Sequence, residues 1–228
     1  MLQVGTILHG TYKIESYLAS GGFGNTYLAK NIEFDETYAI KEFFVKGVCQ
    51  RDGNSTTISV SNAENTNSFE QQREKFKKEA RRLRSLSNPH IVKVYDLFEE
   101  NGTAYYVMDY VDGENLSTRL KRTNAPLAES EVRNYLNQIL DGLEAIHNEG
   151  MFHLDIKPAN IMVDSHDVVK LIDFGASKLQ STVGGATMST GISYTNGYAP
   201  SEQMAQSYDK FKTEDRKSGS AGMPRPIS

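Results

Sequence analysis

The chain has 228 residues, enough for one large domain or two smaller lobes around a cleft, and its 38% hydrophobic and 24% charged residues are typical of a soluble globular protein. A net charge of −4 gives no electrostatic reason to expect nucleic acid or an anionic membrane as a partner, and no run approaches the ~20 apolar residues of a membrane span. Cys49 is the single cysteine, so no internal disulfide can form, and without a signal peptide we expect a cytoplasmic protein.

The first recognisable element is a glycine-rich turn between two strands. Residues 12–30 alternate apolar and polar side chains on both sides of the SGGFG segment at residues 20–24. Glycine lacks a Cβ atom, so backbone N–H groups in such a turn can come close to phosphate. An ordinary hairpin turn would show the same residues, and the pattern alone leaves both interpretations open.

A third strand is predicted at residues 37–43. Lys41 alternates there with the apolar Ile40. A lysine on a strand is usually a solvated charge, and the alternative is a side chain that faces a cleft.

Residues 47–68 are rich in Asn, Ser and Thr, and they predict an irregular insertion with a short strand near residues 57–61. From residue 69 a charge-dense segment predicts a helix, because its apolar or small side chains recur at helical spacing. These are Phe76, Ala80, Leu83 and Leu86. Glu79 lies beside this stripe, where a glutamate is solvated, paired within its own helix, or directed to a neighbouring strand.

Two more antiparallel strands are predicted at residues 91–98 and 103–110, joined by a tight Glu-Asn-Gly turn. They complete a five-stranded small lobe. Residues 108–113 follow, between a strand-rich and a helix-rich half of the chain. A short helix is predicted at residues 115–122 and a strong amphipathic helix at residues 127–148, with a glycine stop signal just past its end.

The stretch HLDIKPANIMVDSHDVVKLIDFG carries the candidate chemistry. Its polar side chains Asp155, Lys157, Asn160 and Asp173 stand on two short loops, and the apolar runs between the loops predict a β-hairpin. A carboxylate that accepts a proton, a lysine that holds phosphate charge and an Asn–Asp pair that holds a divalent metal are the groups that phosphoryl transfer from a nucleotide needs. Each residue taken singly is also an ordinary turn former, so the prediction depends on the ordered pair of motifs.

These motifs resemble the catalytic loop and the D-F-G loop of the protein kinases, and the chain is similar to the eukaryotic-like (Hanks-type) serine/threonine protein kinases of bacteria. The resemblance covers about residues 8–205. It implies an α+β, bilobal protein-kinase-like fold, with a five-stranded β-rich N-lobe and one helix at residues 8–108. An incomplete α-rich C-lobe would occupy residues 109–205, and residues 206–228 would form a disordered tail.

The resemblance implies roles for individual residues. Asp155 would orient the attacking hydroxyl and accept its proton, and Lys157 would stabilise charge on the transferred phosphoryl group. Thr195 would contact both residues and help fix the substrate hydroxyl. Lys41 would contact the α- and β-phosphates and pair with Glu79.

The implied cofactors are ATP and Mg²⁺, with Asn160 and Asp173 as the metal ligands. The hinge backbone at residues 108–113 would bind adenine. The residues expected around ATP are Ala19, Ser20, Gly21, Gly22, Phe23, Gly24, Thr26, Ala39, Lys41, Met108, Asp109, Tyr110, Val111 and Met162. Ala19 replaces the first glycine of the family pattern, and Thr26 replaces the valine that covers adenine.

Leu154 replaces the arginine that normally neutralises an activating phosphate, which implies activity less dependent on phosphorylation of the activation segment. Residues 176–203 are rich in Gly, Ser and Thr and would form that mobile segment, although a plain flexible loop has the same composition. Its end, GYAPSEQ, resembles the family's A-P-E region. The candidate phosphorylation sites are Thr187, Ser189, Thr190 and Ser193.

The family's large lobe continues with several more helices, whereas this sequence ends in a polar Gly/Ser/Pro-rich tail. We therefore expect a C-terminally truncated product or a fragment. Apolar surface on the 127–148 helix would be uncovered and would favour self-association or partner binding, and catalysis by residues 1–228 alone would be weak or absent.

The leading hypothesis is an ATP-dependent enzyme that transfers the γ-phosphate to a Ser or Thr hydroxyl of a protein. A small-molecule phosphotransferase shares a similar Asp/Asn/Asp arrangement, but Lys157 and GYAPSEQ argue against it. A kinase-shaped nucleotide-binding or interaction module without catalysis is the third hypothesis.

Overall fold

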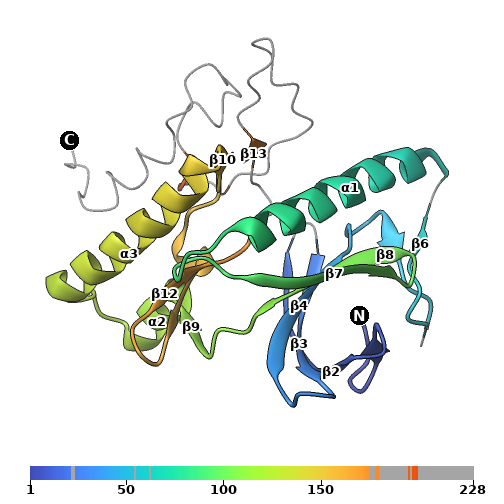
Figure 1. The fold of residues 1–228 in the computed structure, drawn as a ribbon, viewed down its shortest axis with the longest axis horizontal. Coiled ribbons are helices and arrows are strands. Elements are labelled where there is room, and N and C mark those ends of the chain that lie inside the picture. Colours follow the sequence, from blue (N-terminus) through green and yellow to red (C-terminus); the bar gives the residue numbers. More distant parts are fainter. Residues whose placement is uncertain are drawn as a thin grey trace, which may run out of the picture. The chain divides into compact units, whose positions relative to one another are not determined.

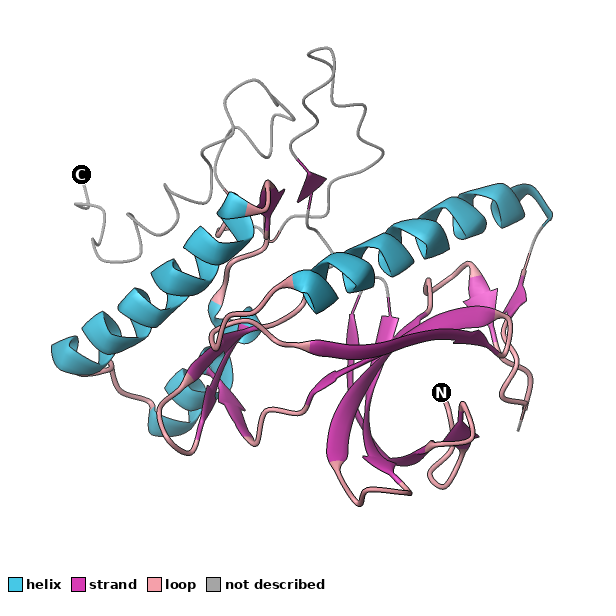
Figure 2. Cartoon of the chain, in the orientation of Figure 1, coloured by secondary structure: helices cyan, strands magenta, loops and turns pink. Residues whose placement is uncertain are grey.

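The computed structural model describes residues 1–21, 24–53, 55–61, 63–174, 178–179, 195 and 197–199. The chain divides into two units (Figures 1 and 2). The N-terminal unit contains Met1–Ser87 and Val92–Tyr110, and the C-terminal unit contains Asn88–Ile91 and the chain from Val111 onward. None of the helices described is long and apolar enough to cross a membrane.

The N-terminal unit is built on a six-stranded antiparallel sheet with strand order β1-β2-β3-β4-β8-β7. The strands are β1 (Ile7–Leu8), β2 (Tyr12–Gly21), β3 (Gly24–Asn31), β4 (Thr37–Phe43), β7 (Val94–Glu100) and β8 (Thr103–Asp109). The prediction of two strands around the glycine-rich turn and of a strand at residues 37–43 is confirmed. The predicted count of five strands was too low, because a two-residue edge strand such as β1 has no periodicity to detect.

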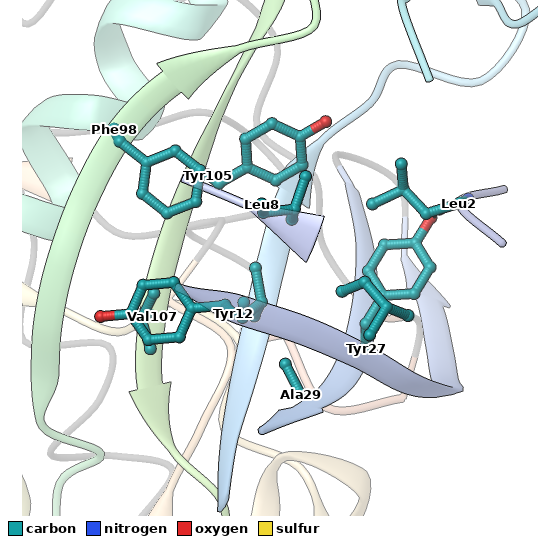
Figure 3. Packing of buried hydrophobic residues seen from close by; sticks show 10 residues of the cluster. Leu2, Leu8, Tyr12, Tyr27, Ala29, Phe98, Tyr105 and Val107 are labelled. Atoms are coloured by element: carbon teal, nitrogen blue, oxygen red, sulfur yellow. Dashed lines mark hydrogen bonds between the residues drawn. The ribbon is translucent and has the colours of Figure 1, made fainter. Parts of the chain in front are cut away.

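One face of this sheet curls around a core made of side chains from all six of its strands (Figure 3). The ring of His9 stacks on Phe98 of β7 with centroids 4.6 Å apart, and the His9 amide donates to Glu100 Oε2 at 2.8 Å. The core residues are Leu2, Leu8, Tyr12, Ile14, Tyr27, Ala29, Ile40, Phe98, Tyr105 and Val107. The segment before β2 therefore fills the open side of the curl.

The opposite face of the sheet packs against helix α1 (Ala63–Ser85), which contacts β7 and β8 (Figure 1). Phe76 of α1 stacks against Tyr106 at 4.8 Å, and Phe69 lies 5.2 Å from Phe43 at the end of β4. The helix begins six residues before the predicted start at residue 69. Residues 63–68 are polar and show no helical stripe, and packing of α1 against a strand of the insertion overrides this weak local signal.

Residues 44–61, called the insertion below, connect β4 to α1, and all of them except residue 54 are described. The insertion contains β5 (Cys49–Gln50) and β6 (Ser59–Val60), which form a separate antiparallel pair. The prediction of a short strand near residues 57–61 is confirmed. The predicted irregular stretch up to residue 68 was too long, because α1 begins at Ala63.

The C-terminal unit contains helices α2 (Leu116–Thr123) and α3 (Glu129–Asn148) and a three-stranded sheet of order β12-β11-β9. Its strands are β9 (Gly113–Asn115), β11 (Ile161–Asp164) and β12 (Val169–Leu171), and a second pair joins β10 (Met151–Phe152) to β13 (Lys178–Leu179). A 3₁₀ turn, η1 (Pro158–Asn160), precedes β11. The predicted hairpin and both predicted helices are confirmed, with α3 beginning two residues later than expected.

Helix α3 packs against β10 and β12 through the stripe that its sequence predicts. The buried side chains of this stripe are Tyr135, Ile139, Leu143 and Ile146. Residues 88–91 also belong to this unit, because the Leu171 amide donates to the His90 carbonyl at 2.8 Å. A Cβ atom at Gly142 would lie 3.2 Å from that carbonyl, which is a tight contact, so glycine lets α3 cross residue 90 without a shift of either backbone.

Candidate active site

The loop before β11 gathers four predicted site residues around one carboxylate. Asp155 accepts hydrogen bonds from Lys157 Nζ at 2.7 Å, from Thr195 Oγ1 at 2.7 Å and from Asn160 Nδ2 at 3.0 Å. Lys157 Nζ also donates to Thr195 Oγ1 at 2.8 Å, and Asn160 Nδ2 donates to the Asp155 carbonyl at 2.9 Å. Residues up to 40 positions apart in the sequence thus form one polar cluster.

The electrostatics of this cluster keep Asp155 ionised. Partial burial raises the pKa of Asp155, but the hydrogen bonds from Lys157 and Thr195 and the charge of Lys157 outweigh burial, so the pKa lies below its usual value. Its side chain is 15% exposed, so a hydroxyl group from solvent or from a substrate can still reach it. The arrangement suits a carboxylate that orients a hydroxyl and receives its proton late in the reaction.

His153 organises the loop, although sequence reasoning assigned it no role. The fully buried imidazole accepts from the Asp155 amide at Nδ1 (3.3 Å), and its Nε2 lies 3.0 Å from the Ile172 carbonyl. A carbonyl can only accept and an amide can only donate, so these partners fix the neutral tautomer with the proton on Nε2. The only sequence signal was a histidine two residues before the candidate base.

The residues that flank the β11–β12 hairpin are joined by a hydrogen bond close to the Asp155 cluster. The Ile172 amide donates to the Asn160 carbonyl at 3.0 Å, and Phe174 is fully buried with its ring 4.5 Å from that of His153. Asp173, between Ile172 and Phe174, has a φ of 61°. Asn160 and Asp173 therefore stand at the same end of one hairpin, as the sequence predicts.

Leu154 also has positive φ, at 63°, and its side chain is only 1% exposed. A left-handed conformation costs a non-glycine residue roughly 1–2 kcal/mol, whereas burying a leucine side chain contributes about 1.5–3 kcal/mol. Burial can therefore offset the backbone strain here. The residue that replaces the family's arginine is thus part of the core beneath the loop.

The oxygen atoms at this hairpin end fit a magnesium ion. Asn160 directs both of its described side-chain hydrogen bonds through Nδ2 to Asp155, which leaves the amide oxygen for another partner. Mg²⁺ prefers oxygen ligands and commonly takes only one or two from a protein, with water and phosphate oxygens completing its shell. Asn160 and Asp173 supply the correct donor type for such an ion.

In the N-terminal unit, Lys41 and Glu79 meet at the side chain of Tyr106. Lys41 Nζ lies over the Tyr106 ring, 5.7 Å from its centroid, and the Tyr106 hydroxyl donates to Glu79 Oε1 at 3.5 Å. Lys41 is 7% exposed and Glu79 is 9% exposed. The interpretation of Lys41 as a solvated strand lysine is therefore wrong, and the predicted Lys41–Glu79 pairing stays a prediction.

Other residues expected around ATP share one face of the sheet with Lys41. Thr26 of β3 is the cross-strand partner of Lys41, and Ala39 of β4 is the partner of Met108 on β8. Because side chains alternate along a strand, all four point to the face opposite the curled core. This is the placement that the resemblance implies.

The glycine-rich turn is partly explained by packing. A Cβ atom at Gly24 would lie 2.3 Å from the Glu42 carbonyl, so the close approach of β4 requires glycine there. A Cβ atom at Gly21 would meet nothing within 4 Å, and packing does not explain this second glycine. Ala19 and Ser20 are exposed at the end of β2, and Gly22 and Phe23 lie outside the described residues.

The remaining residues expected around ATP are Asp109 and Tyr110 of the N-terminal unit and Val111 and Met162 of the C-terminal unit. The Asp109 carboxylate accepts hydrogen bonds from the Lys93 amide at 3.1 Å and from the Tyr95 hydroxyl at 2.7 Å. These bonds hold its side chain within the N-terminal unit. Tyr110 is half-exposed and Val111 is buried. Met162 on β11 is partly exposed.

Several predictions lie on parts of the chain that are not described. These are most of the predicted activation segment with its candidate sites Thr187, Ser189, Thr190 and Ser193, and the tail at 206–228. The prediction that Lys41, Asp155 and Asp173 share one cleft joins residues of both units, and it also stays a prediction.

The sequence matches the protein kinase domain family over residues 12–215. The chain belongs to the protein kinase family. This confirms the kinase fold that the ordered motifs predict.

Named relatives agree with this assignment. The chain is 34% identical over 193 residues to the serine/threonine-protein kinase PrkC of Bacillus subtilis, covering 85% of this chain and 26% of PrkC. It is 34% identical over 180 residues to mitogen-activated protein kinase kinase kinase 2 of Arabidopsis thaliana, covering 78% of this chain and 25% of that protein. The chain therefore spans about a quarter of the length of these relatives.

A solved structure, the apo form of PpkA-294, is similar with a TM-score of 0.72 and 28% sequence identity. The match covers 77% of this chain and 62% of that chain. The kinase fold is thus supported by structure as well as by sequence.

Proposed function

We propose that this kinase domain transfers the γ-phosphate of ATP to serine or threonine hydroxyls of a protein substrate. The observation that carries the proposal is the hydrogen-bonded cluster of Asp155, Lys157 and Thr195. It combines a carboxylate that can hold the attacking hydroxyl with a cation that can hold the phosphoryl oxygens. The names of the bacterial relatives support the choice of serine and threonine.

Each residue of the Asp155 cluster has a separate role in this reaction. Asp155, ionised and held at both carboxylate oxygens, orients the substrate hydroxyl and accepts its proton. Lys157 neutralises charge that develops on the transferred phosphoryl group, and Thr195 holds the side chains of Asp155 and Lys157 in position. Asn160 and Asp173 would hold Mg²⁺, which would supply positive charge for the phosphate oxygens.

The N-terminal unit supplies the nucleotide contacts in this proposal. Lys41 binds the α- and β-phosphates, and Glu79 orients the lysine from helix α1. Thr26, Ala39 and Met108 line the adenine side of the same sheet face. Because the donor is ATP, we place the domain in the cytoplasm.

Protein substrates are favoured over small alcohols, since the relatives named above are protein kinases and Lys157 donates to Thr195, the contact that the resemblance to protein kinases implies. Transfer from labelled ATP to a serine- and threonine-containing peptide library, compared with choline and an aminoglycoside, checks this choice. Label on the small alcohols alone would contradict it.

A nucleotide-dependent thermal shift in the presence of Mg²⁺ separates a live nucleotide site from an inert interaction scaffold. We expect Mg·ATP to raise the thermal unfolding midpoint of the wild-type chain and to raise that of Asp173→Ala much less, because ligand that binds only the folded state stabilises it. Glu144→Ala, on the exposed face of α3, is the matched control and should respond as the wild type does. An equal shift in Asp173→Ala and wild type would contradict the metal assignment.

Self-association stays a prediction of the sequence. Val132 and Leu140 are exposed apolar residues on α3, at 38% and 41%. Size-exclusion chromatography over a concentration series checks it, and a constant monomer would contradict it.

A further inference from the structure

Glu42 is a buried carboxylate that the proposed reaction does not use. It follows Lys41 on β4, so its side chain points to the opposite face of the sheet, into the curl. It accepts from Asn25 Nδ2 at 3.0 Å, Tyr27 Oη at 3.0 Å and Tyr105 Oη at 2.9 Å, and its Oε1 lies 2.5 Å from Arg51 Nη2. A charge with 0% exposure is costly unless it is paired, and here it is paired completely.

Arg51 brings this charge partner from the insertion. Its side chain is 3% exposed, and besides Glu42 it binds the insertion itself, with Nε donating to the Thr56 carbonyl at 2.9 Å. One guanidinium group therefore connects β4 to two places in the insertion. An exposed surface ion pair would not restrict the chain in this way.

The insertion in turn contacts the turn between β7 and β8. The Ile58 amide donates to the Asn101 carbonyl at 2.8 Å, and Ile58 is buried. A Cβ atom at Gly102 would lie 2.9 Å from the Ile58 carbonyl, so the two segments touch through their backbones.

Helix α1 is attached to the same turn. Arg73 Nη1 donates to the Gly102 carbonyl at 3.4 Å, and Arg73 Nη2 lies 3.5 Å from Glu99 Oε2. Lys77, one turn further along the helix, also bonds to Glu99, and α1 packs directly on β6 of the insertion. Strand β4, the insertion, the β7–β8 turn and α1 thus form a closed ring of contacts.

We propose that Arg51 is a positioning residue, whose bonds to Glu42 and Thr56 fix the insertion and thereby hold helix α1 with Glu79 beside Tyr106 and Lys41. The proposal rests on the proposed kinase function for its consequence, since Lys41 and Glu79 serve the nucleotide. Arg51 itself touches neither of them. It acts through the insertion, on the opposite side of β4 from Lys41.

A conservative variant separates this role from simple charge neutralisation. Arg51→Lys keeps a positive charge for Glu42, but one ammonium group cannot reproduce the planar fork that binds both Glu42 and the Thr56 carbonyl. The double variant Glu42→Gln/Arg51→Gln removes both charges and leaves no buried charge unpaired. Arg133→Lys makes the same change in an exposed ion pair with Glu129 and is the matched control.

Hydrogen–deuterium exchange of the 228-residue chain tests the proposal directly. In Arg51→Lys and in the double variant we expect amides in residues 55–61 and 65–75 to exchange about 10-fold faster, with β2 and β3 unchanged, because only local opening is affected. Arg133→Lys should match the wild type. Unchanged exchange in residues 65–75 would overturn the proposal, and so would a uniform acceleration across the N-terminal unit.

Enzyme kinetics test the consequence of the proposal for catalysis. Where the wild type transfers phosphate, Arg51→Lys should lower kcat about 5-fold and change the KM for ATP less than about 2-fold, since alignment of Glu79 matters most in the transition state. An unchanged kcat would overturn the positioning role. A wild type without phosphoryl transfer would agree with the weak or absent catalysis that we expect of residues 1–228 alone. The exchange data would then decide by themselves whether Arg51 holds α1.

Discussion

The carboxylates of Glu42 in the N-terminal unit and Asp155 in the C-terminal unit have partners of the same three kinds: a cation, hydroxyl groups and a side-chain amide. Glu42 has Arg51, two tyrosines and Asn25, and its side chain is 0% exposed. Asp155 has Lys157, Thr195 and Asn160, and its side chain is 15% exposed.

The difference between the two clusters lies in access and in rigidity. Glu42 is surrounded by the hydroxyl groups of two tyrosines and by a planar guanidinium group. Its carboxylate has no exposed surface that another molecule could reach. Asp155 is bound by a flexible lysine and a small threonine, and a hydroxyl group can still approach. In the function we propose, similar hydrogen bonding serves stability in one unit and chemistry in the other, and solvent exposure distinguishes the two carboxylates.

The largest expected effect concerns catalysis at the exposed cluster. Asp155→Asn should lower kcat by about 10²- to 10⁴-fold, because the amide cannot accept the substrate's proton. Urea unfolding should show a folded variant that is somewhat less stable than the wild type, because it loses the charge that pairs with Lys157. A variant that retains activity would remove the distinction between the two carboxylates.

At the buried cluster the expected effect is on stability. Glu42→Gln keeps the shape of the side chain but leaves Arg51 as an unpaired buried charge, which should cost about 3–5 kcal/mol of unfolding free energy. Urea denaturation followed by circular dichroism measures it. Glu129→Gln, which breaks the exposed pair with Arg133, is the control and should leave the midpoint unchanged.

A smaller effect is expected from removing one hydroxyl group. Burial first, and then the charge of Glu42, raise the pKa of Tyr105, so its hydroxyl remains a donor to Glu42 throughout the accessible pH range. Tyr105→Phe should cost about 1.5–3 kcal/mol, as for a hydrogen bond to a charged group. The same urea titration checks this value, and an unchanged midpoint would show that the other donors suffice.

The smallest effect is the pH dependence that Asp155 contributes. Its pKa is lower in the folded chain than the usual value of 3.8, so its stabilising contribution is complete above that value and is lost as the pH falls through the lower, folded pKa. Below about pH 4 the wild type should therefore lose more stability than Asp155→Asn, which has no carboxyl group to titrate. Parallel curves for the two proteins would contradict the lowered pKa.

Local sequence patterns predicted much of this fold. The alternation around Lys41 predicts β4, the apolar stripe predicts α3, and the two apolar runs after Asn160 predict the hairpin that brings Asn160 and Asp173 to one end. These elements depend on periodicity within a few residues, which a single sequence displays. The polar cluster at Asp155 was predicted through the resemblance of its motifs.

Features set by distant contacts were not predictable in the same way. The early start of α1 depends on packing against β6, and the role of His153 depends on the carbonyl of Ile172, just after β12. For Glu42, the sequence showed only that its side chain alternates with that of Lys41. It did not reveal its partner Tyr105, which is 63 positions away. The alternation in a strand predicts that the side chains of consecutive residues point to opposite faces of the sheet. Which of the two faces encloses a core depends on how the whole sheet curls.

The contact between His9 and Glu100 has a consequence for how the protein is made. The two residues are 91 positions apart, so during translation the beginning of the chain leaves the ribosome long before its partner on β7 exists. Leu2 and Leu8, buried in the finished core, must meanwhile stay in contact with water or with a chaperone. Residues 2–9 are thus synthesised well before β7, and the sheet closes around them only after β7 has emerged.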